Sequence, residues 1–259
     1  MNIGVNKKLS VCMAVFNGDK FLDYQLSSII NNFISNISLE IIIVDDKSND
    51  KSLRICENYK SRFNNIKINI IKNKKNLGSV SSFEKAIFAS KSNIIMLCDQ
   101  DDFWVKGRID YMLNILNFNK NIDLLIGNFK LVDYKILKDY TNKYKFRHGT
   151  TELKKLTLSD FVFKRYPFYG CCMAFRSEIL EKVLPFPKWI DAHDRWIAIN
   201  SIANNSAYFY NKIVTLRGMH DNNQTSNKRK LSKRLKSFFN KLFMFLLVII
   251  RNIYRNKFF

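Results

Sequence analysis

Patterns that mark several common protein classes are missing from this 259-residue chain. There is neither a GxGxxG nor a GxxxxGKS stretch, so a dinucleotide-binding oxidoreductase or a P-loop enzyme is not expected. No apolar run reaches the roughly 18–20 residues that a membrane-spanning helix needs. Met1–Lys8 is polar and the apolar segment after it is short, so we expect no secretory signal peptide. With 47% apolar residues, the chain is nevertheless able to form a sizeable core.

The cysteines show neither the pattern of a metal site nor that of a disulfide framework. None of the five belongs to a CxxC pair, and the adjacent Cys171 and Cys172 are not spaced for a disulfide. Most of the cysteines lie in apolar, strand-like runs, where burial is expected. The odd count and the predicted burial therefore favour a reducing, cytoplasmic compartment.

Acidic residues are absent from the last part of the chain. Residues 225–259 contain ten Lys or Arg and no Asp or Glu, so they supply ten of the net +21 charges. Charge concentrated at one end of a chain suggests an anionic surface as a partner. Apolar residues recur at helical spacing in this tail, with Lys233, Lys236 and Lys241 off that face; they lie at positions 235, 238, 239, 242, 246, 249 and 250.

This pattern predicts a basic amphipathic helix that lies in the membrane interface, where each Lys or Arg near an anionic leaflet contributes ~1 kcal/mol. The apolar run Leu242–Ile250 is nine residues long, too short to span a bilayer. Packing of the helix on the body of the protein or on a second subunit is the alternative. Nucleic-acid binding is not expected, because the basic charge is segregated from the acidic residues and no nucleic-acid motif is present.

The first hundred residues alternate between apolar strand-like runs and segments of helical spacing. Strands are predicted over 9–16, 39–44, 66–71 and 94–98, and helices over 21–33, 51–63 and 80–89. Such alternation implies an α/β fold with a parallel sheet covered by helices on both faces. Later strands are predicted over 124–132, 168–176 and 208–214. Later helices are predicted over 106–117, 156–163, 177–183 (capped by Ser177) and 191–204, and the polar segment 134–152 is predicted to be a loop over the site.

The strand predicted over 94–98 ends in a cluster of acidic residues. Asp99, Asp101 and Asp102 follow the buried run within four positions. Carboxylates crowded behind a buried strand need a compensating charge. The usual one is a divalent cation with oxygen ligands, such as Mg²⁺ or Mn²⁺, which would in turn hold a diphosphate. Capping of the next helix is the alternative, although a helix start accounts for one or two acidic residues better than for three.

Other predicted strands also end in polar residues, and ligands of open α/β sheets bind outside the carboxyl ends of the strands. Six stretches, taken in order, resemble the family 2 glycosyltransferases, which have the GT-A fold and use nucleotide-activated sugars. They are AVFNG (14–18), VDDKSND (44–50), NLG (76–78), DQDDFW (99–104), HDRW (193–196) and HDNNQ (220–224). The last three look most like the bacterial rhamnosyltransferase branch of the family.

The resemblance implies a GT-A domain over 1–225, with a nucleotide-binding half over about 9–105, an acceptor-side half over 106–225 and the basic tail over 226–259. Its mostly parallel central sheet would be flanked by helices. Phe16 would pack against the nucleotide base, with Ala14 and Asn17 beside it, and Asp45 would accept the base N–H. A core aromatic at the end of a strand is the competing account of Phe16.

Further residues of the donor site follow from the same resemblance. Asp46 and Ser48 belong to the loop after the second strand, where Ser48 is also a candidate cap for the next helix. Asn76 and Gly78 would shape the loop under the sugar nucleotide, and a plain glycine turn is the competing account of that stretch. Gln100 lies within the acidic stretch and joins the residues expected to bind the donor.

The resemblance also divides the acidic stretch into roles. Asp99 would reach the ribose, and Asp101, with Asp102 nearby, would bind Mn²⁺ or Mg²⁺. A cation held against the diphosphate neutralises charge that develops on the leaving group, an effect worth several kcal/mol. His220 would be a further contact to the metal or the diphosphate, and a purely structural histidine is the alternative.

The candidate for the general base is Asp194, which opens a helix on the acceptor side. An inverting transfer needs a carboxylate that removes the proton of the acceptor hydroxyl as this hydroxyl attacks the anomeric carbon. Asp191 is the nearest rival, with a helix cap as its competing role. Trp189 and Trp196 are candidates for stacking on a sugar ring, and core packing accounts for them equally well.

The sequence therefore predicts a metal-dependent inverting glycosyltransferase. It would move a sugar, rhamnose by the branch it resembles, from a nucleotide-diphosphate sugar to a glycan or lipid-linked acceptor of bacterial surface polysaccharide. We expect a cytoplasmic protein that associates peripherally with the inner face of the cell membrane. Two alternatives are a sugar nucleotidyltransferase and a catalytically silent module that binds sugar nucleotides or membrane. The first should carry a glycine-rich loop with Arg or Lys near the N-terminus, and residues 14–19 are not one.

Overall fold

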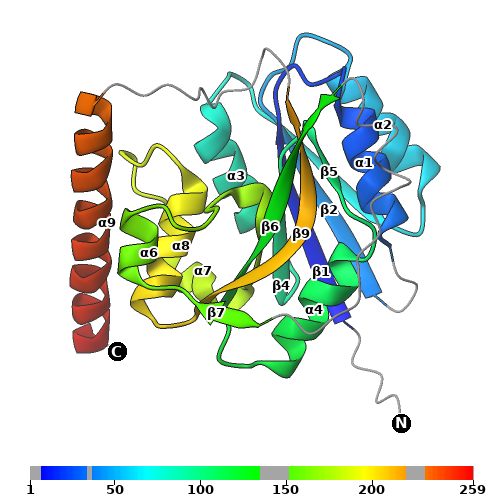
Figure 1. Ribbon diagram of the computed structural model, residues 1–259. Helices are drawn as coiled ribbons and strands as arrows, with labels where there is room; N and C mark the ends of the chain where they lie inside the picture. Colours follow the sequence, from blue (N-terminus) through cyan, green and yellow to red (C-terminus); the bar gives the residue numbers. More distant parts are fainter. Residues whose placement is uncertain (1–6, 34–36, 135–151, 220–230, 259) are drawn as a thin grey trace.

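The computed structural model describes residues 7–33, 37–134, 152–219 and 231–258 (Figure 1). They form one sheet with the order β3-β2-β1-β4-β8-β6-β9-β5, in which β7 also pairs with β9. The first four strands are parallel to one another; they are β1 (Lys7–Val15), β2 (Ile37–Asp45), β3 (Lys67–Lys72) and β4 (Ile94–Cys98). Strands covered on both faces read as continuous apolar runs, which explains why the sequence revealed them so clearly.

Helices connect these strands and cover both faces of the sheet (Figure 1). The helix α1 (Leu22–Asn31) packs on α2 (Ser52–Arg62), whereas α3 (Gly78–Phe88) packs on β1 and β2 and contacts α8 (His193–Ala203). The side chains between these layers are fully buried, among them Leu9, Leu26 and Ile41. The predicted α/β sheet flanked by helices is therefore confirmed.

The second half of the sheet is mixed rather than parallel. The strand β8 (Met173–Arg176) runs antiparallel between β4 and β6 (Leu124–Asp133), and β6 is parallel to β9 (Ala207–Met219). Two short strands, β5 (Asp102–Trp104) and β7 (Leu153–Lys155), are antiparallel to β9. Neither was predicted, because three residues are too few to show an alternating pattern.

Two local predictions need correction. The strand expected over 168–176 begins only at Met173, because residues 170–172 form a 3₁₀ turn. Ser177 does not cap a helix over 177–183. Its hydroxyl faces the Glu178 carboxylate, 3.4 Å away, and a 3₁₀ turn over 177–179 precedes α7 (Leu180–Val183). The helices expected over 106–117 and 156–163 are α4 (Arg108–Phe118) and the shorter α6 (Leu158–Val162). The loop predicted over 134–152 lies almost wholly outside the described residues.

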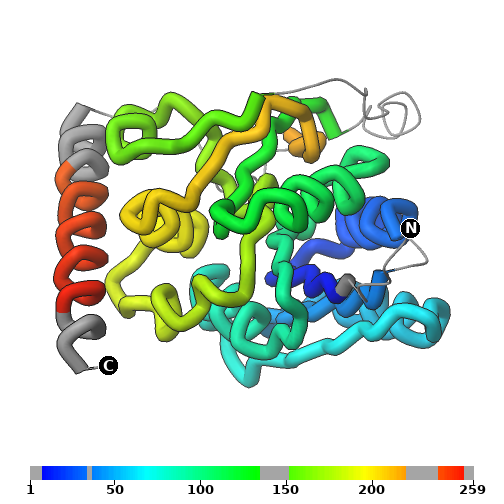
Figure 2. Tube along the Cα trace, turned by 90° about the horizontal axis from the view of Figure 1, so that it is seen from below, coloured from blue at the N-terminus to red at the C-terminus, as the bar shows by residue number. Residues whose placement is uncertain are grey.

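The tail forms one long helix, α9 (Leu231–Phe258), which stands at the edge of the molecule beside α6 and α8 and away from α1 (Figures 1 and 2). The predicted alternative of packing on the body is observed for one side of the helix. Met244 and Val248 are buried on that side, and the Lys241 ammonium donates to the carbonyl oxygens of Phe161 (3.0 Å) and Val162 (2.6 Å). Lys241 therefore faces protein, where a lipid headgroup cannot reach it.

The opposite side of α9 is apolar and exposed. Its exposed side chains are Phe239, Leu242, Phe243, Leu246, Ile249, Ile250 and Ile253. Within the described residues, we find no helix with the length and apolar character that crossing a membrane requires.

We expect Lys241→Met to lower the free energy of unfolding by about 1–3 kcal/mol, because two buried carbonyl groups lose their charged donor. Asn240→Met, one residue earlier on the exposed side of α9, should change it by less than about 0.5 kcal/mol. Urea unfolding of the three proteins measures the difference. Equal midpoints for both variants would show that Lys241 does not anchor the helix.

Candidate functional site

The strand order reverses between β1 and β4, and this reversal places the candidate site. The chain proceeds from β1 outward to β2 and β3 and then returns to β4 on the other side of β1. In open α/β sheets, a crevice forms at such a point outside the carboxyl ends of the strands. The turns that follow β1, β2 and β4 meet there, and they carry the donor-binding and acidic residues predicted from the sequence.

The turns after β1 and β2 are joined by backbone-to-side-chain hydrogen bonds. The Asn17 N–H donates to Ser48 Oγ (3.1 Å), and the Asn49 N–H donates to Asn17 Oδ1 (2.8 Å). The Asp19 N–H donates to Asp50 Oδ2 (3.0 Å). Ser48 thus holds the neighbouring turn, and α2 has no side-chain cap, so the capping role considered for Ser48 is not observed. The two turns form one rigid rim.

Gln100 connects this rim to the acidic turn after β4. Its Oε1 accepts from the Phe16 N–H (2.9 Å) and its Nε2 donates to the Phe16 carbonyl (3.1 Å). A Cβ at Gly18 would lie 2.5 Å from Gln100 Oε1, so a larger residue there would displace the Gln100 side chain from this position. Phe16 is 43% exposed, which rules out the competing account of a core aromatic. Ala14 lies just inside, at the end of β1 and partly exposed.

Asp45 and Asp46 are both buried but differ in how their oxygens are used. Asp45 Oδ2 accepts from the Ser48 N–H (3.2 Å), whereas Asp45 Oδ1 has no partner among the described residues. Asp46 accepts from the N–H groups of Leu77 and Gly78, each at 2.8 Å. The carboxylate of Asp46 therefore secures the next loop, while Asp45 retains a free acceptor atom.

The loop held by Asp46 leads into α3. Gly78 has a φ of +83°, a backbone angle that residues other than glycine rarely adopt. Its N–H also donates to Asn76 Oδ1 (3.2 Å). A Cβ at Gly78 would meet no atom within 4 Å, so the glycine is explained by its backbone angle rather than by crowding. Asn76 is exposed at the rim of the site.

The acidic turn brings together one set of groups that is suited to a metal ion. Within the described part of the chain, ligand atoms of Asp99, Asp102 and Cys171 all lie within 4.8 Å of one another. Asp102 is 3% exposed and its Oδ2 has no partner among the described residues. Asp101 lies in the same turn, and its charge acts on both neighbouring carboxylates. His220 lies outside the described residues, so its predicted contact stays a prediction.

Burial and crowding disfavour ionised carboxylates in this turn. Burial, with the charge of Asp101 second, raises the pKa of Asp99 to about 7, although part of its surface stays exposed. Burial, followed by the charges of Asp99 and Asp101, raises the pKa of Asp102 well above its usual range. The site therefore lacks positive charge. A divalent cation would supply this charge and stabilise the ionised carboxylates. Because carboxylate oxygens are hard ligands, the residues present suit Mn²⁺ or Mg²⁺.

Arg217 supplies part of the missing charge and was not singled out from the sequence. It lies opposite Asp102 where β5 pairs with β9, and its guanidinium stacks over the Tyr169 ring at 4.3 Å. Burial lowers its pKa, but the Cys171 thiol and the carboxylates of Asp102 and Asp99 outweigh that effect, and the pKa is raised. The available signal was a basic residue just after a predicted strand and three positions before His220.

Asp194 faces the same site from the other half of the chain. It lies in the first turn of α8, its Oδ2 accepts from the Gly170 N–H (3.3 Å) and its Oδ1 from the Arg195 N–H (2.6 Å). Its charge is near enough to raise the pKa of Asp99. The rival Asp191 is instead exposed and paired with Arg195 at 3.3 Å.

The aromatic residues near Asp194 differ in their surroundings. Trp196 is fully buried and its Nε1–H donates to the Val183 carbonyl (2.9 Å), so it belongs to the core. Trp189 is 46% exposed and contacts Phe243 of α9 at a ring distance of 5.4 Å. His193 is buried and stacks on Phe83 at 3.9 Å, and its burial lowers its pKa.

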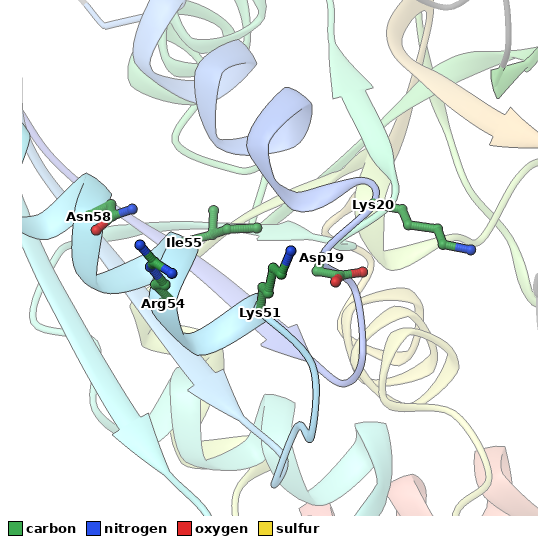
Figure 3. Close-up of a pocket in the computed structure, with 6 residues that line it drawn as sticks. All are labelled: Asp19, Lys20, Lys51, Arg54, Ile55 and Asn58. Atoms are coloured by element: carbon green, nitrogen blue, oxygen red, sulfur yellow. The ribbon is translucent and has the colours of Figure 1, made fainter.

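A basic pocket of about 430 Å³ adjoins the rim (Figure 3). Its residues come from the turn after β1 and from the start of α2; they are Asp19, Lys20, Lys51, Arg54, Ile55 and Asn58. Cationic side chains outnumber the single carboxylate, so the pocket attracts anions. None of the acidic-turn residues lines it.

Comparison of the sequence with known protein families finds one matching family. The family model described as glycosyl transferase family 2 matches residues 10–184. An uncharacterised glycosyltransferase of Methanocaldococcus jannaschii is 31% identical over 76% of this chain and 65% of its own length. A dTDP-rhamnosyl transferase of Shigella flexneri is 27% identical over 82% of this chain and 73% of its own length. The chain therefore spans just under two thirds of the archaeal relative.

Solved structures show the same fold. The Staphylococcus aureus protein TarS (residues 1–349) in complex with UDP-GlcNAc aligns with a TM-score of 0.71 at 18% identity, covering 94% of this chain and 66% of TarS. A mannosyltransferase of Pyrobaculum calidifontis in complex with GDP-Man and Mn²⁺ aligns with a TM-score of 0.64 at 15% identity, covering 85% of this chain and 59% of that protein.

The raised pKa of Asp99 predicts a pH-dependent stability. A carboxyl whose pKa is about 7 when folded and about 3.9 when unfolded costs the protein stability as the pH rises between these values. We therefore expect Asp99→Asn to gain stability over wild type from pH 4 to pH 7, with a constant difference of a few kcal/mol above pH 7.

Chemical unfolding of both proteins from pH 4 to pH 8 measures this difference. Asp110→Asn, at an exposed position on α4, is the control and should run parallel to wild type. Parallel curves for Asp99→Asn as well would mean that the fold does not disfavour the ionised carboxylate.

Proposed function

Because this chain belongs to glycosyl transferase family 2 and has the GT-A fold of the transferases it resembles, we propose that it transfers one sugar from a nucleotide-diphosphate sugar to an acceptor hydroxyl with inversion. The observation that carries the proposal is the approach of Asp194 to the acidic turn: its Oδ2 accepts from the Gly170 N–H (3.3 Å), and the next residue, Cys171, lies in one cluster with Asp99 and Asp102. The reaction needs these two parts side by side: one to hold the leaving diphosphate and one to accept a proton.

In this proposal the donor binds along the rim of the three turns. The exposed ring of Phe16 stacks on the nucleotide base, and the unpartnered Oδ1 of Asp45 accepts a base N–H. Asn17 and Ser48 fix the rim, and Asp99 reaches the ribose. Asp46 acts through the loop of Asn76 and Gly78, which it holds under the sugar nucleotide. Such fixed backbone geometry lowers the entropic cost of orienting the donor.

Asp101 and Asp102, with His220 as a further contact, would hold Mn²⁺ or Mg²⁺. The ion supplies positive charge that offsets the charge developing on the departing diphosphate. Support comes from the crowded carboxylates, which Arg217 compensates only in part. The mannosyltransferase of similar fold was solved with GDP-Man and Mn²⁺.

Asp194 acts as the general base. Its carboxylate takes the proton of the acceptor hydroxyl while the acceptor oxygen bonds to the anomeric carbon and the bond from that carbon to the diphosphate oxygen breaks. Attack occurs on the face opposite the leaving group, so the configuration inverts. The N–H groups of Gly170 and Arg195 hold the carboxylate in one orientation, which suits a base that must meet an incoming hydroxyl.

For the sugar and the acceptor, we propose only the chemical class. A dTDP-rhamnosyl transferase among the relatives favours a deoxyhexose such as rhamnose, moved to a glycan or lipid-linked acceptor of surface polysaccharide. The catalytic domain would be residues 1–225, with donor binding in about 9–105 and acceptor binding in 106–225. The tail 226–259 would be a separate membrane-associating element. A sugar nucleotidyltransferase or a silent binding module remains the alternative for the same cleft.

We expect Asp194→Asn to reduce sugar transfer by about 10²–10⁴-fold, because the amide cannot accept the proton. The matched control is Asp191→Asn, three residues earlier and engaged only in an exposed ion pair, which should keep near-normal turnover. Asp101→Ala should abolish metal-dependent turnover while the protein stays folded. Release of nucleoside diphosphate from a panel of sugar nucleotides with Mn²⁺ measures all three.

Near-normal turnover of Asp194→Asn would exclude Asp194 as the base. Release of inorganic diphosphate from a nucleoside triphosphate and a sugar phosphate would identify a nucleotidyltransferase instead. Failure of every sugar nucleotide to raise the melting temperature, with or without Mn²⁺, would favour the silent module.

We further propose that the outward side of α9 lies against an anionic leaflet on the inner face of the cell membrane. The supporting observation is that apolar side chains, Leu242, Leu246 and Ile249 among them, face away from the body, while Lys241 and Met244 face it. A helix with one apolar side beside basic residues binds the interface through buried area and charge.

We expect the double variant Leu246→Glu/Ile249→Glu to lose flotation with liposomes that contain anionic lipid. Phe118→Glu, at a highly exposed position on α4, should float like wild type, because it adds the same kind of charge far from α9. Equal flotation of the double variant and wild type would exclude this side of α9 as the contact. Flotation that persists on purely neutral liposomes would exclude the requirement for anionic lipid.

A further inference from the structure

We propose that Cys171 releases its thiol proton to solvent when a cation binds at the acidic turn, and that the resulting thiolate is a ligand of that cation. The site would then be a mixed oxygen–sulfur site that takes thiophilic divalent ions such as Cd²⁺, Zn²⁺ and Co²⁺, in addition to the hard ions expected of carboxylates alone. This inference rests on the proposed function only in placing a cation there.

The geometry brings the sulfur to the carboxylates. Ligand atoms of Asp99, Asp102 and Cys171 already lie within 4.8 Å of one another without an ion between them. Around a tetrahedral zinc ion with bonds of about 2.0–2.3 Å, ligand atoms lie roughly 3.3–3.8 Å apart. Small rotations of the Asp102 and Cys171 side chains are therefore enough to converge on one ion, and the partly exposed Asp99 leaves the cluster an open side.

The backbone of Cys171 is held firmly. Its carbonyl oxygen accepts from Arg108 Nη1 (2.6 Å) and from Thr215 Oγ1 (2.9 Å), both fully buried. This pair of donors fixes the 3₁₀ turn in which Cys171 lies. With its backbone fixed, Cys171 presents its side chain from a constant position. Less conformational entropy is then lost when the side chain binds an ion.

A second observation points to a missing ligand. Asp102 Oδ2 is buried, lies in the cluster and has no hydrogen-bond partner among the described residues. A buried carboxylate oxygen without a partner costs free energy unless a cation or donor reaches it. Arg217 brings one positive charge to a turn with three carboxylates. An ion bridging Asp102 and Cys171 would complete this arrangement.

The neighbouring Cys172 provides a matched control. It is in the same turn, is equally buried, and its sulfur lies 4.0 Å from that of Cys171, yet it does not belong to the cluster. Soft thiolate ligands shift the preference of a site toward Zn²⁺ and related ions, whereas Mg²⁺ binds oxygen. Replacing Cys171 should therefore change which ions bind, and replacing Cys172 should not.

The experiment titrates the full-length protein with Cd²⁺ or Co²⁺ in the absence of nucleotide and follows sulfur-to-metal charge-transfer absorption. We expect the band in wild type and in Cys172→Ser and its loss in Cys171→Ser. Affinity for Cd²⁺, measured by calorimetry, should fall by about 10–100-fold in Cys171→Ser, with the Mg²⁺ affinity within about twofold of wild type. A band that persists in Cys171→Ser, or no band in wild type, would overturn the proposal.

Because a serine at this buried position is at risk of not folding, the ¹¹³Cd chemical shift of the wild-type protein provides a second readout. A shift in the range of sulfur-containing sites supports the proposal, and one in the range of all-oxygen sites overturns it. Nucleoside diphosphate release with Mn²⁺ separates this inference from the proposed function. Turnover without a sulfur signal contradicts only the Cys171 ligand, and a sulfur signal without turnover contradicts only the transferase.

Discussion

Repulsion among the carboxylates at the end of β4 is the constraint around which the site is arranged. The strand β4 is fully buried, and it is followed directly by Asp99, Asp101 and Asp102. The low polarity of these surroundings strengthens the repulsion among the three carboxylates. The positive charge of Arg217, on the neighbouring strand β9, offsets part of this repulsion. The pKa values of Asp99 and Asp102 are nevertheless raised above their usual range. The remaining deficit of positive charge suits this turn to a cation and is the basis of the proposed metal and diphosphate site.

The surrounding turns are fixed to this charged centre by specific hydrogen bonds. Gln100 forms hydrogen bonds with both backbone groups of Phe16 and so joins the rim after β1 and β2 to the acidic turn. On the other side, a Cβ at Gly218 would lie 2.6 Å from the Asp101 carbonyl oxygen, so β9 can approach only because that residue is glycine. The rim, the acidic turn and β9 are therefore joined by direct contacts, which is the kind of fixed arrangement that the proposed electrostatic catalysis would need.

The 3₁₀ turn over 170–172 joins the two chemical parts of the site. Its first residue donates its N–H to Asp194, and its second brings a thiol to Asp99 and Asp102. Through this turn, the proposed base and the proposed cation site are held to the same short segment of backbone. The long helix α9 is held to the body through Lys241, which donates to α6, and through Arg251, whose guanidinium lies over the Trp196 ring of α8.

The sequence by itself determined the parallel half of the sheet, the helices between its strands and the list of polar residues at the strand ends, because these depend on local periodicity of 2 or 3.6 residues. Its likeness to a family also placed Asp194 among the candidates. The tertiary structure decided what local patterns cannot encode: the antiparallel β8 between β4 and β6, the burial of Lys241 against α6, and the meeting of Cys171 and Arg217 with Asp99. These contacts join residues far apart in the chain, and only the packing of the whole sheet brings them together.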